Sequence, residues 1–210
     1  TRRSSELYMK KLYLVRHGES EWNKLKKIQG QQDVSLTNKG IEQAKITGKR
    51  LMKEKIQKIY SSDLKRAYDS AKIIGEILNV EVIPLKELRE INFGIWEGLT
   101  EDIVKSKFNK EHEKWLKEPE KLKIEGAETI KELQERVMKG VNKIINQEKV
   151  DNILIVSHSA ALKTIILGLL GMDLSYFKNL SLKNLSLSII EFRQYNRVLT
   201  LLNDTNHLDI

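Results

Sequence analysis

Short apolar runs alternate with amphipathic stretches along most of this chain. Mainly apolar runs predict buried strands at 12–15, 56–60, 80–85 and 152–156, and two final strands at 187–192 and 198–202. Apolar residues at helical spacing predict helices at about 38–51, 64–78, 128–147 and 160–170. A loop rich in Gln, Asn and Gly is predicted at 20–36. The alternation of strands and helices indicates an α/β domain with a mostly parallel sheet.

The stretch 86–125 departs from this pattern, because it is highly charged, weakly periodic and contains Trp96 and Trp115. We expect it to form loops and short helices, with a cap-like insertion at about 99–126 that covers the strand ends and sets substrate specificity. The rest of residues 9–210 is expected to form one domain around it. Residues 1–8 are polar and patternless and Met9 directly precedes the first strand, so we expect an artificial tail before a native start at Met9.

The charge balance changes this picture little. The chain has 37 Lys and Arg against 29 Asp and Glu, a net charge of +8, which raises the question of a nucleic-acid partner. Lys and Glu are interleaved, as at 53–55 and 110–114, and such interleaving is typical of solvated helix faces. No apolar run reaches the length of about 18 residues that a membrane span needs. The absence of cysteine excludes a thiolate nucleophile and, with no signal peptide at the N-terminus, favours a cytoplasmic location.

Two of the four histidines directly follow predicted strands, His17 in the sequence Arg16-His17-Gly18-Glu19 and His158 in Ser157-His158-Ser159. Parallel strands place their carboxyl ends side by side, so we expect the two histidines to meet. Arg16 beside His17 would repel a metal cation, whereas an arginine fork matches the oxygens of a phosphate. A neutral imidazole in such an anion site can attack phosphorus. The residues therefore favour a phosphate site without a metal.

Several longer segments carry a resemblance to a known family. They are 14–23 (Leu-Val-Arg-His-Gly-Glu-Ser, then Trp-Asn), 36–44, 60–67 (Tyr-Ser-Ser-Asp-Leu-Lys-Arg-Ala), 88–98 and 156–158. Over about residues 11–204 the chain resembles the histidine phosphatase superfamily, the phosphoglycerate mutase-like family. The resemblance implies a three-layer α/β/α fold. Among its members, the chain is most similar to small bacterial phosphatases such as α-ribazole-5′-phosphate phosphatases, metal-independent phosphoserine phosphatases and broad-specificity phosphatases.

The resemblance implies a role for each matching position. His17 would be the nucleophile that becomes phosphohistidine. Arg16, Arg66 and His158 would hold the phosphoryl oxygens, and Asn23 would help them.

Four more positions follow from the resemblance. Glu90 would be the proton donor and acceptor, although other glutamates nearby are rivals on spacing alone and only the family match selects it. Gln29 and Gly30 match positions on the substrate side of relatives. Ser159 stands where many relatives have Gly, which is harmless if only its backbone N–H contacts the phosphate.

We expect a metal-independent phosphomonoesterase that needs no cofactor and acts on small phosphorylated metabolites. A cofactor-dependent phosphoglycerate mutase is the nearest alternative. Mutases carry an added basic, Pro-rich segment after the acid motif, whereas residues 97–126 contain one Pro and no Arg, so hydrolysis is favoured. A non-enzymatic nucleic-acid-binding protein is the alternative from a different class, and no basic and aromatic motif supports it. The resemblance also suggests a homodimer, because dimers are common among relatives.

Overall fold

The computed structural model describes residues 10–208, so the expectations for residues 1–8 and for Met9 lie outside it. Six strands form one sheet: β1 (Lys10–Arg16), β2 (Lys58–Ser61), β3 (Val82–Pro84), β4 (Asn152–Ser157), β5 (Leu187–Phe192) and β6 (Arg197–Asp204). Their order in the sheet is β3-β2-β4-β1-β5-β6. The first four strands of that order are parallel, β5 runs antiparallel to β1, and β6 runs antiparallel to β5. The prediction of a mostly parallel sheet is confirmed.

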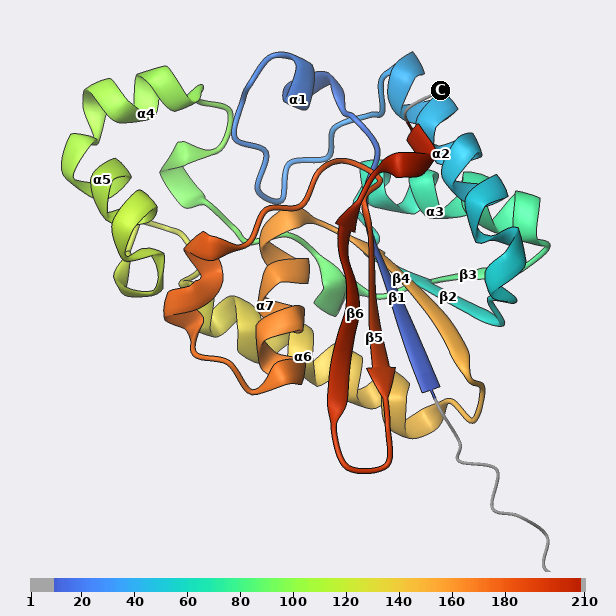
Figure 1. The fold of residues 1–210 in the computed structure, drawn as a ribbon. Coiled ribbons are helices and arrows are strands. Elements are labelled where there is room, and N and C mark those ends of the chain that lie inside the picture. The colour runs from blue at the N-terminus through green and yellow to red at the C-terminus, as the bar shows by residue number, and fades with distance from the viewer. Residues whose placement is uncertain (1–9, 209–210) are drawn as a thin grey trace, which may run out of the picture.

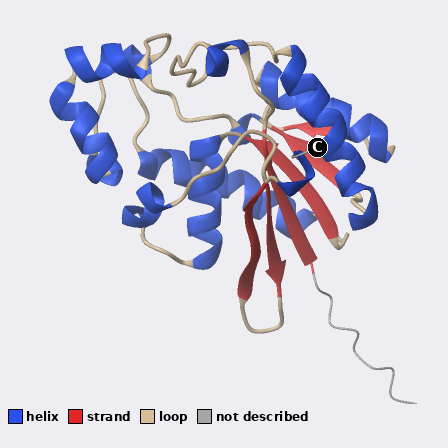
Figure 2. Ribbon diagram, turned by 45° about the horizontal axis from the view of Figure 1, so that its top comes forward, coloured by secondary structure: helices blue, strands red, loops and turns tan. Residues whose placement is uncertain are grey.

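Helices cover both faces of this sheet (Figures 1 and 2). The helices of residues 10–208 are α1 (Glu21–Lys24), α2 (Asn38–Leu51), α3 (Lys65–Leu78), α4 (Glu101–Lys107), α5 (Asn109–Lys117), α6 (Ile130–Gln147) and α7 (Ser159–Leu170), with short 3₁₀ turns between some of them. Helices α2 and α3 pack on one face and α6 and α7 on the other, which confirms the three-layer α/β/α fold.

The side chains of β1 show how the sheet is buried on both faces. Leu12 and Leu14 point into the cluster that α6 and α7 complete, whereas Tyr13 and Val15 point into the cluster of α2 and α3. Alternate residues of a strand face opposite sides, so a continuous apolar run is what a doubly covered strand requires. Each such side chain, when fully buried, contributes about 1.5–3 kcal/mol of transfer free energy.

Local capping explains where the helices begin. The hydroxyl of Thr37 accepts a hydrogen bond from the N–H of Gly40 at 3.0 Å, so Thr37 is the N-cap and α2 begins at Asn38. Thr129 and Glu132 form a capping box, so α6 begins at Ile130 and not at Glu128.

One predicted loop contains a helix. Residues 21–24 form the single turn α1, because Ser20 caps it and exchanges hydrogen bonds with Asn23. A helix of one turn leaves no periodic apolar signal, so the sequence pattern could not predict it.

The segment expected to act as a cap contains α4 and α5. Its residues Val104 and Leu122 form a small core with Trp96, which precedes the segment. In Figure 1 the segment lies beside the α1 region, at the end of the sheet where β1 and β4 finish. It is therefore in a position to cover whatever binds at those strand ends.

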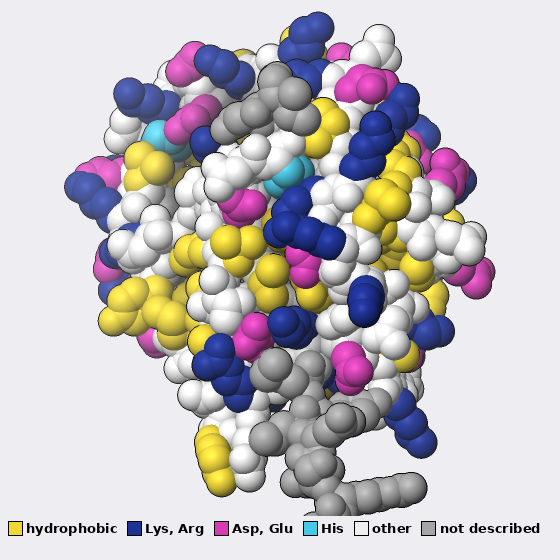
Figure 3. All heavy atoms as spheres, turned by 45° about the vertical axis from the view of Figure 1, so that its right-hand side comes forward, with side chains coloured by type: hydrophobic (Ala, Val, Ile, Leu, Met, Phe, Trp, Pro, Cys, Tyr) yellow, Lys and Arg dark blue, Asp and Glu magenta, His cyan; other side chains and the backbone are white. Residues whose placement is uncertain are grey.

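The distribution of surface charge and the character of the helices concern two possible partners, a nucleic acid and a membrane. On the face drawn in Figure 3, Lys and Arg side chains are interspersed with Asp and Glu, as the interleaved sequence indicates. Among residues 10–208, no helix has the length and apolar character needed to cross a membrane.

Candidate active site

The ends of β1 and β4 bring the two histidines together. Arg16 and Ser157 are partners in the parallel register, and the N–H of His17 donates to the carbonyl of Ser157 at 2.9 Å. The rings of His17 and His158 lie 5.1 Å apart, centroid to centroid, with their planes tilted by 59°. The prediction that the two histidines meet is confirmed.

The backbone fixes the tautomer of His17. Its Nδ1 lies 2.7 Å from the carbonyl oxygen of Gly18, and because that oxygen can only accept, Nδ1 carries the proton. In the neutral ring Nε2 then holds the lone pair. The N–H of Gly18 donates to the hydroxyl of Ser70 at 2.9 Å, which holds the loop after β1 against α3. A Cβ on Gly18 would lie 2.8 Å from the carbonyl oxygen of Gly40, so this approach requires glycine.

Arg66 extends from the first turn of α3 to His17. Its Nε donates to Nε2 of His17 at 3.3 Å, and its two terminal nitrogens donate to the carbonyls of Gln32 and Gly30, each at 2.7 Å. Three of the five N–H groups of the guanidinium are thus used, and the remaining two are available to an anion. Arg16 is held by a 2.7 Å hydrogen bond from its Nη1 to the carbonyl of Leu182.

Burial and like charges determine the electrostatics of the site. Burial, together with the cations Arg66 and Arg16, holds the pKa of His17 well below its ordinary value of 6.5. The pKa of His158 is also lowered well below 6.5, again mainly by burial. Burial lowers the pKa of Arg66 to about 10, although Glu90 opposes the shift. Both histidines are therefore neutral beside two arginine cations at neutral pH, which suits a dianionic ligand.

Glu90 lies at the N-terminus of α7. Its Oε1 accepts from the N–H groups of Ile91 and Ala161, each at 3.0 Å, and its Oε2 accepts from the N–H of Ala160 at 3.2 Å. These bonds hold the carboxyl group of Glu90 in one orientation.

Arg136 holds the segment that carries Glu90. It forms a bidentate pair with Glu128 at 2.7 and 2.8 Å and donates to the carbonyls of Glu87, Arg89 and Glu90 at 2.9–3.1 Å. Helix α6 thereby fixes the backbone on which the candidate acid is mounted.

The residues that the resemblance placed on the substrate side are also near. The hydroxyl of Ser20 donates to Oε1 of Gln29 at 2.6 Å. Gly30 has a φ of +51°, and a Cβ there would lie 1.9 Å from a carboxylate oxygen of Glu97, so both conformation and space require glycine. Asn23 accepts a 3.2 Å hydrogen bond from the side chain of Asn184.

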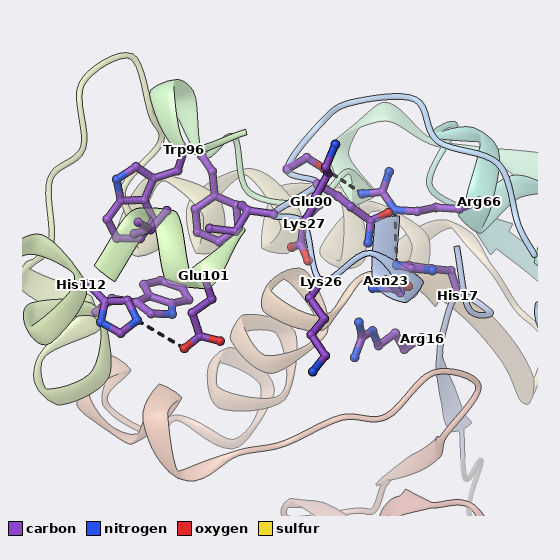
Figure 4. A pocket seen from close by; sticks show the side chains of 16 residues that line it. Arg16, His17, Asn23, Lys26, Lys27, Arg66, Glu90, Trp96, Glu101 and His112 are labelled. Carbon is purple, nitrogen blue, oxygen red and sulfur yellow. Dashed lines mark hydrogen bonds and ion pairs between the residues drawn. The ribbon is translucent and has the colours of Figure 1, made fainter. Parts of the chain in front are cut away.

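A cavity of about 360 Å³ joins these groups to the segment 99–126 (Figure 4). Arg16, His17, Asn23 and Arg66 lie together at one end, and Glu90 also lines the cavity. Trp96, Glu101 and His112 lie at the other end, with Lys26 between the two groups. Gln29 and Gly30 line the cavity as well.

His158 and Ser159 are not among the residues that line this cavity. The side chain of His158 is fully buried, and its Nε2 lies 2.8 Å from the hydroxyl of Ser62. Ser159 is the first residue of α7 and is half-buried. Within residues 10–208, no group of three or more His, Asp or Glu side chains is arranged to hold a metal ion.

Sequence reasoning missed three supporting residues, namely Ser62, Arg136 and Asn184. Only Asn184 left a signal, because it precedes β5, and an antiparallel strand begins at the edge where β1 ends. Its side chain donates to the carbonyl of His17 at 2.9 Å.

The lowered pKa values predict that stability depends on pH. Histidine in the unfolded chain titrates near 6.5, so below that pH the unfolded state binds more protons than the folded state, in which His17 and His158 stay neutral. The free energy of unfolding should fall from pH 7.5 to pH 5.5, by at most about 1.4 kcal/mol per pH unit for each histidine. Urea unfolding at the two pH values measures this. His158→Asn should lose about half of the slope, and an unchanged slope would contradict the assignment.

Comparisons with known proteins agree with this geometry. The family model described as "Histidine phosphatase superfamily (branch 1)" matches residues 12–205. The chain is 36% identical over 200 residues to phosphoserine phosphatase 1 of Hydrogenobacter thermophilus, covering 95% of each chain. It is 34% identical over 211 residues to a probable phosphoglycerate mutase, GpmB, of Yersinia pestis, covering 96% of each. The solved structure of Bacillus stearothermophilus YhfR superposes with a TM-score of 0.89 at 29% identity, covering 95% of this chain and all of that one.

The family model covers nearly all of the described residues, and the relatives match over almost their whole lengths. The buried histidine pair with its arginines lies inside the matched region. The chain therefore belongs to the histidine phosphatase superfamily, branch 1.

Proposed function

We propose that this protein is a phosphomonoesterase that hydrolyses small phosphorylated metabolites through a phosphohistidine formed on His17, without a metal ion. One observation carries the proposal: Nδ1 of His17 is committed to the carbonyl of Gly18, which leaves the Nε2 lone pair beside Arg66 at the arginine-lined end of the cavity. A neutral imidazole in that position is a nucleophile that needs no separate base.

In the first half of the reaction, Nε2 of His17 attacks phosphorus and the bond from phosphorus to the leaving oxygen breaks. The leaving oxygen takes the proton of Glu90. When the substrate phosphate binds, the weak 3.3 Å hydrogen bond from Nε of Arg66 to Nε2 of His17 breaks. The freed N–H then donates to a phosphoryl oxygen. Charge neutralisation by Arg16 and Arg66 is the main requirement of phosphoryl transfer.

In the second half, water attacks the phosphohistidine. Glu90, now ionised, takes the proton of the water, the bond between phosphorus and nitrogen breaks, and orthophosphate leaves. One carboxyl thus acts first as acid and then as base. The ring of His158 packs beside that of His17, with centroids 5.1 Å apart, and Asn23 lies at the same end of the cavity as His17.

The second half of the reaction, in which the phosphohistidine is consumed, favours hydrolysis over mutase activity. A mutase must retain a second phosphate group near the first, which calls for cations around the outer cavity. The segment 97–126 supplies no Lys or Arg to that wall, where its residues are Glu101, Val104, His112 and Trp115. The two lysines of the wall, Lys26 and Lys27, come from the loop after α1. The relative named phosphoserine phosphatase 1 supports the same choice. The cytoplasmic location and the homodimer stay predictions.

The proposal is tested by orthophosphate release from phenyl phosphate, measured in buffer with and without EDTA. We expect turnover that EDTA leaves unchanged, since arginines neutralise the phosphate charge. In parallel, 3-phosphoglycerate is incubated with a catalytic amount of 2,3-bisphosphoglycerate, and 2-phosphoglycerate is assayed. Faster isomerisation than phosphate release would establish the mutase alternative, and inhibition by EDTA would overturn metal independence.

A further inference from the structure

We propose that the leaving-group half of the cavity selects alcohols with a flat apolar body, such as aryl-alkyl alcohols, and that Trp115 is the residue that determines this preference. The inference rests on the proposed function and names its substrate class. It differs from the charged three-carbon substrate that the name of the Hydrogenobacter relative states.

The walls of the cavity divide it into two parts. The phosphate end is built of Arg16, His17 and Arg66, whereas the remainder combines an apolar, largely aromatic wall with polar side chains. The apolar lining consists of Ile28, Phe93, Trp96, Val104 and Trp115. The apolar surface of a ligand cavity supplies contact area, while its polar groups fix the orientation of the ligand. A phosphate with a two- or three-carbon alcohol would leave most of this apolar lining uncovered.

Trp115 is held in place before any ligand arrives. Its ring meets Phe93 edge-on, with centroids 5.4 Å apart and planes at 77°, and meets Phe177 at 5.6 Å and 63°. Phe177 is buried, and Trp115 and Phe93 are half-buried. Edge-to-face contacts of this kind add about 0.5–1.5 kcal/mol each beyond area burial. A rigid aromatic wall loses little entropy when a flat group packs on it.

The charged residues of the outer cavity are poorly placed to replace the hydration of a small zwitterion. The side chain of Glu101 is 71% exposed and lies 3.3 Å from Nε2 of His112. Lys27 lies over the ring of Trp22 at 5.6 Å, and Lys26 is exposed. Exposed charges of this kind contribute little to binding. An ammonium or carboxylate packed on the ring of Trp115 would lose water without gaining a charged partner from that ring.

The test compares primary alkyl phosphates, because their leaving groups have similar intrinsic reactivity. Values of kcat/KM are measured for 2-phenylethyl phosphate, ethyl phosphate, O-phosphoserine and 3-phosphoglycerate. We expect 2-phenylethyl phosphate to exceed each of the other three by about tenfold or more, the discrimination that an apolar pocket provides. In Trp115→Ala the ratio of 2-phenylethyl phosphate to ethyl phosphate should fall at least about fivefold.

Leu116→Ala is the matched control, because Leu116 is the next residue of α5 and is 55% exposed. It should keep the wild-type ratio. If Trp115→Ala does not fold, inhibition of the wild-type protein by 2-phenylethylphosphonate and ethylphosphonate gives the same comparison. Higher kcat/KM for O-phosphoserine or 3-phosphoglycerate, or equal ratios in the two variants, would overturn the inference while leaving the phosphatase intact. Failure to release phosphate from all four compounds and from phenyl phosphate would instead overturn the proposed function.

Discussion

His17→Ala is expected to reduce the hydrolysis of phenyl phosphate by about 10⁴-fold or more, the loss seen when a covalent nucleophile is removed from an otherwise intact site. The reason lies in the geometry of the ring. Its Nδ1 is bound to the carbonyl of Gly18, and its Nε2 faces the cavity beside Arg66. Phosphate release at saturating substrate measures the effect.

A second readout separates loss of the nucleophile from loss of the fold. Wild-type protein quenched in base during turnover should carry phosphate in an acid-labile bond, as a phosphohistidine does, and His17→Ala should carry none. Because His17 is buried, the variant must also show the far-UV circular dichroism of the wild type. A folded variant with more than about 1% of wild-type turnover contradicts a covalent role for His17.

Much of this site was predictable because it sits at strand ends. The apolar runs predict β1 and β4, the topology rule for parallel strands places their ends together, and His17 and His158 follow them. Arg66 was predictable only from the family motif, since its place at the first turn of α3 says nothing about where its side chain extends. Glu90 was selected among several glutamates for the same reason.

The supporting contacts were not predictable, because they depend on side chains that cross between elements. Arg136 lies within α6, where a charged residue is ordinary, yet its guanidinium donates to three carbonyls of a loop far away in the sequence. Those carbonyls belong to Glu87, Arg89 and Glu90. Helical periodicity places Arg136 on α6, but it does not specify which loop the guanidinium reaches.

The helix α1 and the hydrogen bond between Ser62 and His158 were missed for a related reason. A single capped turn has no periodicity, and a serine after a strand is compatible with any turn. Binary patterning therefore predicts the layers and the edge of the sheet that carries the site, while the contacts that orient the site depend on tertiary packing.

Arg66→Ala is expected to lower kcat/KM for phenyl phosphate by about 10²–10³-fold, the effect of removing one preorganised donor to a transition-state oxyanion. The side chain is 1% exposed and is fixed by the carbonyls of Gly30 and Gln32, so its guanidinium is already held in place at the arginine-lined end of the cavity. Arg66→Lys keeps the charge but loses the planar fork and cannot make both carbonyl bonds while serving the phosphate. We therefore expect lysine to restore less than about a tenth of the lost activity.

Arg50→Ala is the control for the loss of one arginine, because Arg50 lies on α2 and pairs with Glu54 at 2.6 Å away from the cavity lining. It should leave kcat/KM unchanged. Inorganic vanadate, a phosphate mimic, supplies an independent binding readout, and its inhibition constant should rise in both Arg66 variants but not in Arg50→Ala. Full activity in Arg66→Lys would mean that charge alone is sufficient, and the bidentate role of the Arg66 guanidinium would then be wrong.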